Sequence, residues 1–290
     1  MTTTRTDDVH VGRYYGERQI EITPELVQHY AEAVRDFNPW YFGDSPFGGP
    51  VAPALILHSE VYSSIDWYLS IFGNLHARQE WELFHPIMVG ETVMARRQII
   101  DRYLKRDREY VVNETSVYGA DGRILNRGRT HQSFLVRKDV VGDVVDKDRE
   151  KRSDRRFDAP AETVLGEIAA SEKEITIEMC QKFSGPHKNY HNDVDEARKL
   201  GFPDIVVQGM MSLCFVSEMM TERFGAGWFA GGKMNVNLVN VLWQGERVTS
   251  HGAVIETATE GPRSRAQLRA WCEKADGTKI VAGTASALTD

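Results

Sequence analysis

Two histidines and one aspartate stand where acid–base chemistry is possible. His187 and His191 lie in the stretch 184–193, SGPHKNYHND, which follows a short helical pattern. Asp36 opens the stretch 36–41, DFNPWY, after a similar pattern nearer the N-terminus. Imidazole and carboxylate groups are common general acids and bases in enzymes. We therefore treat these two loops as candidate sites for proton transfer.

The two loops belong to two related units, because the chain repeats itself at a nearly constant displacement. Gly90-Glu91, Ala120-Asp121-Gly122 and Gly128 recur 155 positions later as Gly245-Glu246, Ala275-Asp276-Gly277 and Gly283. Earlier, Glu21-Ile22-Thr23 recurs at a displacement of 153 as Glu174-Ile175-Thr176. We expect an N-terminal domain over 1–140, a charged linker over 141–164 and a C-terminal domain over 165–290.

Each unit shows the same order of elements. A helix start at Thr23-Pro24-Glu25, with a capping Thr and a Pro in the first turn, has its counterpart at Thr176. Long apolar segments at 54–72 and 208–224 then predict a buried central helix in each unit. Strand patterns follow near 80–84, 92–101, 109–118 and 128–136, and again near 233–241, 246–257, 263–273 and 279–288. Asp121-Gly122 and Asp276-Gly277 are hairpin signals.

These elements predict an α+β fold in which a curved antiparallel sheet wraps a central helix in each unit. Two such units in tandem would place their sheets side by side, as in a dimer of identical subunits.

Composition narrows the possible partners. The 290 residues carry a formal net charge of −7, which argues against nucleic acid or an anionic membrane as a general partner. No stretch approaches the roughly 20 apolar residues that span a bilayer, and we expect a cytoplasmic protein. The three cysteines, Cys180, Cys214 and Cys272, lie in apolar surroundings without a CxxC pair, as reduced buried thiols do.

The loop motifs resemble those of the MaoC-like family of R-specific enoyl-CoA hydratases and dehydratases. In that family a helix ends in S-G-D-x-N-P-L-H-x-D, an E-x-A segment and G-F or G-Y follow, and H-G-M or H-G-L begins the central helix. Here the matching elements are the stretch 184–193, Glu196-Ala197, Gly201-Phe202 and Gln208-Gly209. The resemblance covers essentially the whole chain and implies a tandem double hotdog fold, similar to the FAS1-like dehydratase and mesaconyl-CoA hydratase type.

The resemblance also implies a mechanism. An Asp and a His five residues apart would position a water for addition to, or elimination from, an α,β-unsaturated acyl thioester. A backbone N–H at the start of the central helix would polarise the thioester carbonyl, where the helix dipole also favours negative charge. No metal or other cofactor is implied, and the partner would be an acyl-CoA or an acyl-carrier thioester. We also expect a homodimer of the double unit.

Each unit keeps only half of this pair. The first has Asp36 and Asn38 but Tyr41 at the histidine position, and Pro53-Ala54 at the helix start. The second has His191 but Pro186 at the aspartate position.

We therefore centre the predicted site on the second unit. His191 would be the acid–base group, His187 or Asn189 would replace the carboxylate, Gly209 would donate to the oxyanion and Gln208 would orient the substrate. Asp36 is a further catalytic candidate, and Asn38 and Tyr41 are candidate substrate contacts.

Other interpretations of these residues stay open. Asp36 could form an Asx-turn with Asn38 and have no role in chemistry. Trp40, Tyr41, Trp228 and Phe229 could be core or pocket wall. His187 and His191 have the spacing of a helical metal pair, but Gly185 and Pro186 indicate a loop and no third ligand is evident. The remaining candidates for a site, His58, His76, His85, His131 and His251, lack sequence partners and are expected to be structural.

Two functions from other classes also fit the sequence. A thioesterase would share the fold and the acyl-thioester pocket but would release the free thiol. A specialised or non-catalytic acyl-binding protein would explain why Pro186 stands where the carboxylate is expected.

Overall fold

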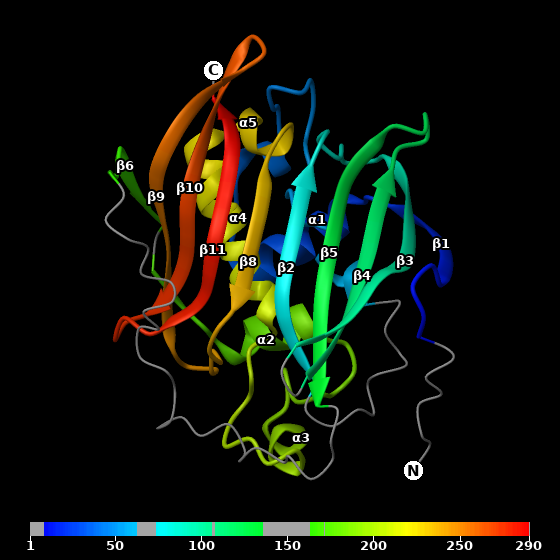
Figure 1. Cartoon of the computed structure of the whole chain (residues 1–290), viewed down its shortest axis with the longest axis vertical. Coiled ribbons are helices and arrows are strands. Elements are labelled where there is room, and N and C mark those ends of the chain that lie inside the picture. Colours follow the sequence, from blue (N-terminus) through cyan, green and yellow to red (C-terminus); the bar gives the residue numbers. More distant parts are fainter. Residues whose placement is uncertain (1–8, 63–73, 106–107, 136–162, 171, 290) are drawn as a thin grey trace.

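A computed structural model of the chain describes residues 9–62, 74–105, 108–135, 163–170 and 172–289 (Figure 1). The strands form one 11-stranded sheet in the order β1-β3-β4-β5-β2-β8-β11-β10-β9-β6, with β7 pairing to β9. The strands of the first unit are β1 (Tyr14–Glu21), β2 (Leu75–Leu83), β3 (Thr92–Lys105), β4 (Arg108–Tyr118) and β5 (Ile124–Leu135). Those of the second are β6 (Gly166–Ala169), β7 (Lys173–Glu174), β8 (Lys233–Leu238), β9 (Arg247–Glu260), β10 (Arg263–Lys274) and β11 (Lys279–Thr289).

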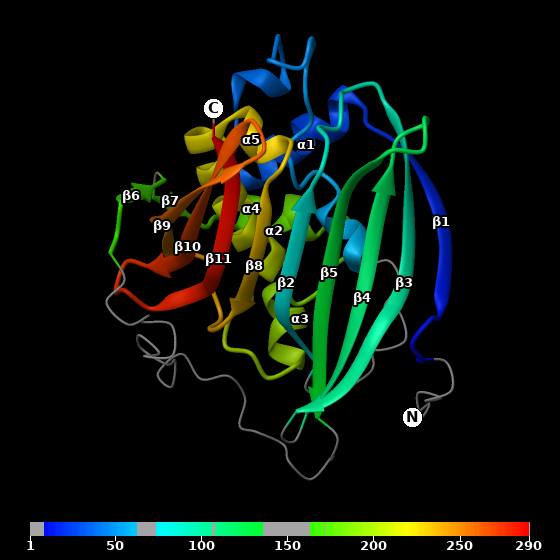
Figure 2. The same cartoon turned by 45° about the horizontal axis from the view of Figure 1, so that its top comes forward.

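The two halves of the sheet meet at β2 and β8, which pair antiparallel at the centre (Figure 2). Trp81 is in register with Met234 there, and Gln79 with Val236. The predicted side-by-side arrangement of two antiparallel sheets is therefore confirmed. Gly122 and Gly277 have φ values of 82° and 83° in the β4–β5 and β10–β11 turns, which confirms both hairpins.

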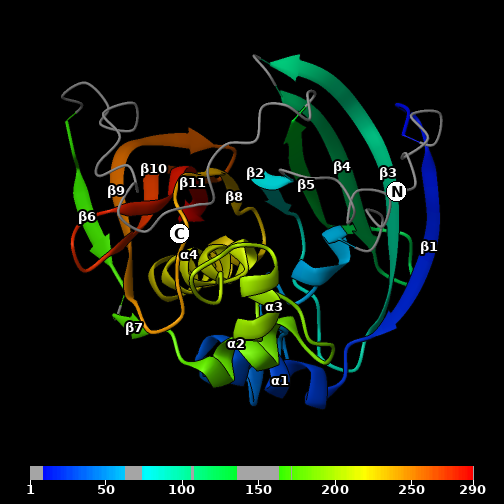
Figure 3. The same cartoon turned by 90° about the horizontal axis from the view of Figure 1, so that it is seen from below.

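The helices lie against the concave side of the sheet (Figure 3). They are α1 (Pro24–Val34), α2 (Ile177–Ser184), α3 (Val194–Lys199), α4 (Gly209–Phe224) and α5 (Ala226–Phe229), with short 3-10 helices η2 (Pro39–Tyr41) and η3 (His58–Tyr62). Both predicted helix starts are confirmed, because Thr23 Oγ1 accepts from Leu26 N and Thr176 Oγ1 accepts from Met179 N. Helices α1 and α2 pack against each other across the two units.

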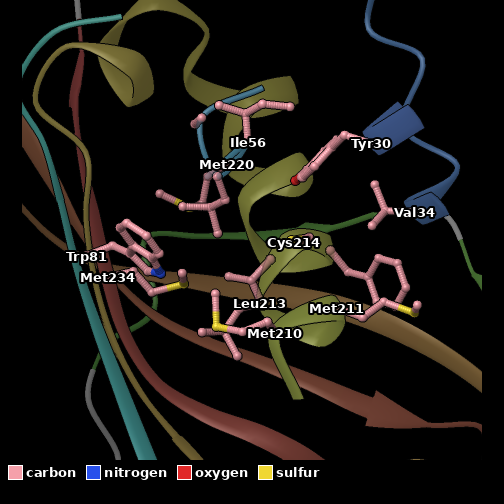
Figure 4. Close-up of a cluster of buried hydrophobic side chains, with 14 of the residues drawn as sticks. Tyr30, Val34, Ile56, Trp81, Met210, Met211, Leu213, Cys214, Met220 and Met234 are labelled. Carbon is pink, nitrogen blue, oxygen red and sulfur yellow. The ribbon is translucent and has the colours of Figure 1, made fainter. Parts of the chain in front are cut away.

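Helix α4 is the central helix predicted for the second unit and lies within the curve of β8 to β11. Its residues from Met210 to Thr221 are buried, apart from Glu218, so the helix is enclosed on nearly every side. The core around it is shared by both units (Figure 4), with Tyr30 and Val34 of α1, Trp81 of β2 and Met234 of β8 in one cluster with α4.

The first unit differs from the prediction. Residues 54–62 form turns followed by η3 instead of the start of a long α-helix, and the remainder of the predicted helix, 63–72, lies outside the described residues. Ile56 N bonds to Pro53 O and Glu60 N bonds to Leu57 O, so these contacts span three residues instead of four. Glu60 is buried and pairs with the exposed Arg18 of β1, with 2.9 Å between Nη1 and Oε1, and η3 packs against β4 and β5.

The sequence patterns did not predict strands β1, β6 and β7, nor helices α3 and α5. Nearly all of the predicted linker, 141–164, lies outside the described residues, so the domain boundaries stay predictions. No helix among the described residues is long and apolar enough to cross a membrane.

Candidate functional site

The loop after α2 is held by two asparagines. Asn189 Nδ2 donates to the carbonyls of Ser184 and His187, at 2.8 and 2.9 Å. Asn192 Nδ2 donates to the same two carbonyls, and its Oδ1 accepts from Asn189 N at 2.8 Å. The side-chain groups of Asn189 are thus engaged within the loop, and this asparagine shapes the backbone that carries His191.

His191 is fixed by its backbone and by its ring. Its N–H donates to Asn189 Oδ1 at 2.9 Å, and its Nδ1 lies 2.8 Å from the carbonyl oxygen of Val206. A carbonyl can only accept, so Nδ1 carries the proton and Nε2 is the basic nitrogen. Burial lowers the pKa of His191 to about 4, and the Val206 hydrogen bond opposes that shift only in part. The ring is therefore neutral near pH 7 and able to accept a proton.

Aromatic rings surround one side of His191. The Tyr190 ring lies 3.9 Å from the His191 ring between centroids, and Phe202 stacks on Tyr190 at 5.8 Å. Phe202 in turn contacts Trp243 edge-on at 6.5 Å. This apolar surrounding is the physical cause of the lowered histidine pKa.

The N-terminus of α4 follows two residues after Val206. Gln208 is the N-cap residue, and its side chain makes no capping hydrogen bond. An added Cβ on Gly209 would lie 2.1 Å from Leu238 Cδ2 of β8, so any side chain at this position would displace the leucine. The first N–H groups of α4 and the positive end of its dipole are thus set near the carbonyl that holds His191.

The remaining predicted residues of the second unit are less enclosed. His187 is exposed. Pro186, at the position of the family aspartate, borders a hollow of about 420 Å³ that lies between α1 and α2 and also includes His29 and Lys182. Among the described residues, no group of three or more His, Cys, Asp or Glu is arranged to hold a metal ion.

The corresponding loop of the first unit brings Asp36 and Tyr41 together. Helix α1 ends at Val34 with Arg35 as its C-cap, and Asp36 N then bonds back to Ala31 O. Asp36 Oδ1 accepts from Asn38 N at 3.3 Å, and Asn38 Oδ1 accepts from Trp40 N at 3.0 Å to cap η2. The predicted Asx-turn is confirmed, and the side chain of Asn38 is engaged in the local backbone.

Tyr41 donates its phenolic O–H to Asp36 Oδ2 at 2.8 Å, and both side chains are buried. Desolvation raises the pKa of Asp36, and it also raises the pKa of Tyr41 well above its usual value, with the nearby Asp36 charge adding to the effect. A buried phenol of this kind holds its proton at neutral pH.

A lysine and a glutamate from the second unit lie next to this pair. Lys173 Nζ donates to the carbonyls of Val34 and Arg35 at the end of α1, at 3.1 and 2.9 Å, and to Glu218 Oε1 of α4 at 2.8 Å. Burial, followed by the charge of Asp36, raises the pKa of Glu218 to about 8, while Lys173 opposes the shift. Sequence reasoning missed both residues, although a charged residue inside the apolar pattern of 209–221 was a usable signal.

Several structural expectations are corrected or refined. Four of the histidines expected to lack partners have them, because the fold brings distant segments together: His58 stacks on Phe183, His76 contacts Tyr62 and Gln79, His131 contacts Glu80, and His251 contacts Glu273. Trp228 and Phe229 are 0% and 2% exposed and belong to the core. The three cysteines are free and buried, as expected.

The chain thus folds as two units, each with a curved antiparallel sheet. The units are joined through β2 and β8 and share one core, which is a double hotdog fold. Residues 9–126, in its first unit, match the family described as FAS1-like, dehydratase domain region.

Solved structures agree with the fold at low sequence identity. A MaoC-like dehydratase is 16% identical, with a TM-score of 0.74, and the match covers 97% of this chain and 98% of that one. A MaoC-like dehydratase from Phytophthora capsici is also 16% identical, with a TM-score of 0.70 and 99% of both chains covered. A conserved hypothetical protein from Mycobacterium tuberculosis, described as having a double hotdog fold, is 11% identical, with a TM-score of 0.65 and 97% of both chains covered. No curated protein sequence matches the chain.

Proposed function

We propose that this protein is a hydratase or dehydratase that adds or removes water at the α,β position of an acyl thioester, with an acyl-CoA or acyl-carrier thioester as substrate. The observation that carries the proposal is the neutral His191 ring, whose Nδ1 is held by Val206 O so that Nε2 is the proton-accepting atom. The match of residues 9–126 to a dehydratase domain family supports the same class of reaction.

In the hydration direction, His191 Nε2 would accept a proton from the attacking water. The electron pair of the new C–O bond would displace the conjugated double bond, and the thioester oxygen would take the negative charge. Backbone N–H groups at the start of α4, Gly209 first, would donate to that oxygen, and Gln208 would orient the thioester. The enolate would then re-form the thioester carbonyl and take the proton from His191 Nε2 at its α-carbon, which returns the histidine to its neutral form and completes the addition of water. Dehydration would follow the same steps in reverse.

The second unit has no aspartate at position 186, so a different group must orient the water. Asn189 acts on His191 through the loop backbone, and His187 is the exposed candidate for a second proton carrier. Asp36 lies in the first unit and is already bonded to Tyr41. We therefore assign the working site to the second unit and a structural role to the Asp36–Tyr41 pair.

The proposal is tested by the loss of conjugated-thioester absorbance when the protein meets short, branched and aromatic 2-enoyl-CoA substrates. Turnover that disappears in His191→Ala is the expected result. Release of free thiol without loss of the double bond would instead identify a thioesterase.

Acyl binding without turnover is a second candidate function. Two observations favour it. Pro186 stands at the position of the family aspartate, and the His191 ring is bonded to the Val206 carbonyl instead of to a carboxylate. A folded protein that binds acyl-CoA but turns over no 2-enoyl-CoA would support it. A homodimer of the double unit remains our proposal for the assembly.

A further inference from the structure

The inner face of the first sheet carries buried polar side chains where a hydrophobic core is expected. All are between 0% and 2% exposed, and they come from β2, β4 and β5: Gln79, Asn113, Thr115, Thr130 and Gln132. Strand register places them on one face, because Thr130 is paired with both Gln79 and Asn113, and Thr115 is paired with Gly128, which Trp81 covers. We call these five residues the polar inner face.

The second unit shows what the same positions hold when a helix covers them. Adding 155 to each of the five positions gives Met234, Leu268, Ala270, Ala285 and Ala287, all apolar and at most 3% exposed. There α4 packs against β9, β10 and β11. The two faces have the same backbone arrangement, so the change from apolar to polar residues is specific to the first unit.

Part of the polar inner face is satisfied internally. Thr130 Oγ1 donates to Gln79 Oε1 at 2.7 Å, and His76 lies 3.0 Å from the same oxygen through Nε2. Since an amide oxygen only accepts, Nε2 carries the proton, and His76 Nδ1 accepts from the Tyr62 hydroxyl at 2.9 Å. These residues form a hydrogen-bonded chain from η3 to β5.

Within the part of the chain that the structure describes, the rest of the face has no hydrogen-bond partners. Both side-chain polar atoms of Asn113, the hydroxyl of Thr115 and Oε1 of Gln132 are buried without one, and so is Nε1 of Trp81 beside them. Native proteins satisfy nearly all buried polar groups, and an unsatisfied one costs stability. Several on one sheet face indicate that a ligand supplies the missing bonds. The set includes donors and acceptors, which suits hydroxyl and carbonyl groups better than a carboxylate that only accepts.

The polar inner face connects to the candidate catalytic loop. Tyr62 ends the hydrogen-bonded chain. Burial raises the pKa of Tyr62 well above its usual value, and the charge of the neighbouring Tyr190 adds to the effect. Tyr190 is the residue whose ring lies against His191. Tyr62 and Tyr190 therefore link the polar inner face to the loop that carries His191.

We propose that the polar inner face holds the acyl part of the substrate and that this acyl part carries hydroxyl or carbonyl oxygens away from the thioester. This inference rests on the function proposed above, since it names the substrate class of the same site. It predicts that a plain alkyl chain of equal length binds less well, because it would leave Asn113 and Thr115 without partners.

The test is direct binding by calorimetry, which needs no turnover. The probes are one medium-chain saturated acyl-CoA and a series of the same length with a single hydroxyl group at successive carbons. We expect at least one hydroxylated member to bind about tenfold more tightly than the plain chain, the equivalent of about 1.4 kcal/mol. Asn113→Leu and Thr115→Ala, which copy the residues of the second unit, should each reduce that ratio severalfold. Ser116→Ala, in the next position along β4, is the matched control and should leave the ratio unchanged.

Thermal unfolding without ligand separates binding from a structural role. Asn113→Leu should raise the Tm if Asn113 is kept for a ligand, and should lower it if Asn113 only supports the fold. Thr115→Ala is the smaller change, which keeps the test valid if Asn113→Leu does not fold.

Three results would overturn the inference. They are equal affinity for plain and hydroxylated chains, a preference for hydroxylated chains that is unchanged in both variants, and no binding of any acyl-CoA. A different result would contradict the proposed hydratase function. In that case the protein would bind hydroxylated acyl-CoA with the expected preference but would turn over no 2-enoyl-CoA.

Discussion

Tyr41 donates a 2.8 Å hydrogen bond to Asp36, five residues earlier, at the spacing that a catalytic Asp and His hold in the family this chain resembles. The two side chains are hydrogen-bonded, but a tyrosine stands where that family has the histidine that transfers protons. The pKa of the buried Tyr41 phenol lies well above its usual value, so the phenol cannot act as a base near pH 7. The end of α1 is instead bonded to the second unit by Lys173, which donates to the carbonyls of Val34 and Arg35.

Removing the Tyr41 hydroxyl should reduce stability more than activity. Tyr41→Phe leaves Asp36 Oδ2 buried without its donor, and we expect the free energy of unfolding to fall by about 1–3 kcal/mol. Urea denaturation measures the change. A loss of turnover near a hundredfold in a stable Tyr41→Phe protein would show that the first unit holds the working site.

Removing the His191 imidazole should abolish most catalysis. We expect His191→Ala to lower kcat by about 10²–10⁴-fold, the usual contribution of a general acid–base group. His187→Ala, at an exposed position in the same loop, should have a smaller effect. Steady-state kinetics of both variants on the best 2-enoyl-CoA compare the two histidines, and a larger loss in His187→Ala would reverse their roles.

The pH profile of the reaction should not show the fall in rate near pH 6.5 that is usual for a histidine base. Desolvation lowers the pKa of the half-buried His191 to about 4, and the base is active when deprotonated. The value of kcat/KM should therefore stay level as pH falls from 8 to about 5 and should drop only as pH approaches 4. An acidic limb near pH 6.5 that disappears in His191→Gln would show that the ring is solvated in the free enzyme.

Glu218 should make the protein less stable as pH rises. Its pKa in the folded state is about 8 against an ordinary value of 4.5, so the folded protein binds this proton more tightly than the unfolded chain. Its contribution to stability is fully present below about pH 4.5 and is lost as pH rises through about 8. Lys173 and Asp36 face the same carboxyl group and act in opposite directions.

Glu218→Gln should remove that part of the pH dependence and should be relatively more stable than the parent at pH 8–9. Urea denaturation of both proteins across the pH range measures the difference. Parallel profiles would mean that the Lys173 ion pair keeps Glu218 charged throughout.

Gly209 should be intolerant of any side chain while Leu238 is present. The Cβ of Gly209→Ala would lie 2.1 Å from Leu238 Cδ2, so either the leucine or the helix start must move. We expect a loss of about 1–3 kcal/mol in stability together with reduced turnover. The double variant Gly209→Ala with Leu238→Ala should recover part of the turnover lost in Gly209→Ala. Its turnover should exceed the value expected if the effects of the two single substitutions were independent. Equal losses in the single and double variants would show that the contact is not the cause.

Much of the architecture followed from local pattern. The capping threonines, the hairpin glycines and the strand periods predicted α1, α2, α4 and most strands, because each signal depends on neighbouring residues. The segment 54–62 was misread as the start of a helix, since an apolar run alone does not distinguish a helix from buried turns. Its buried Glu60 pairs with the exposed Arg18, 42 residues earlier, a contact that no local pattern indicates.

The sequence by itself determined that the chain contains two related units and that each retains half of a family dyad, because repeats and motifs are properties of order along the chain. Only the tertiary structure decided what surrounds those residues. It placed Lys173 and Glu218 of the second unit beside Asp36 of the first, and it placed the unpartnered groups of Asn113 and Thr115 on one inner face. Such environments arise from contacts between segments far apart in sequence, and burial there sets both the pKa values and the cost of an unmet hydrogen bond.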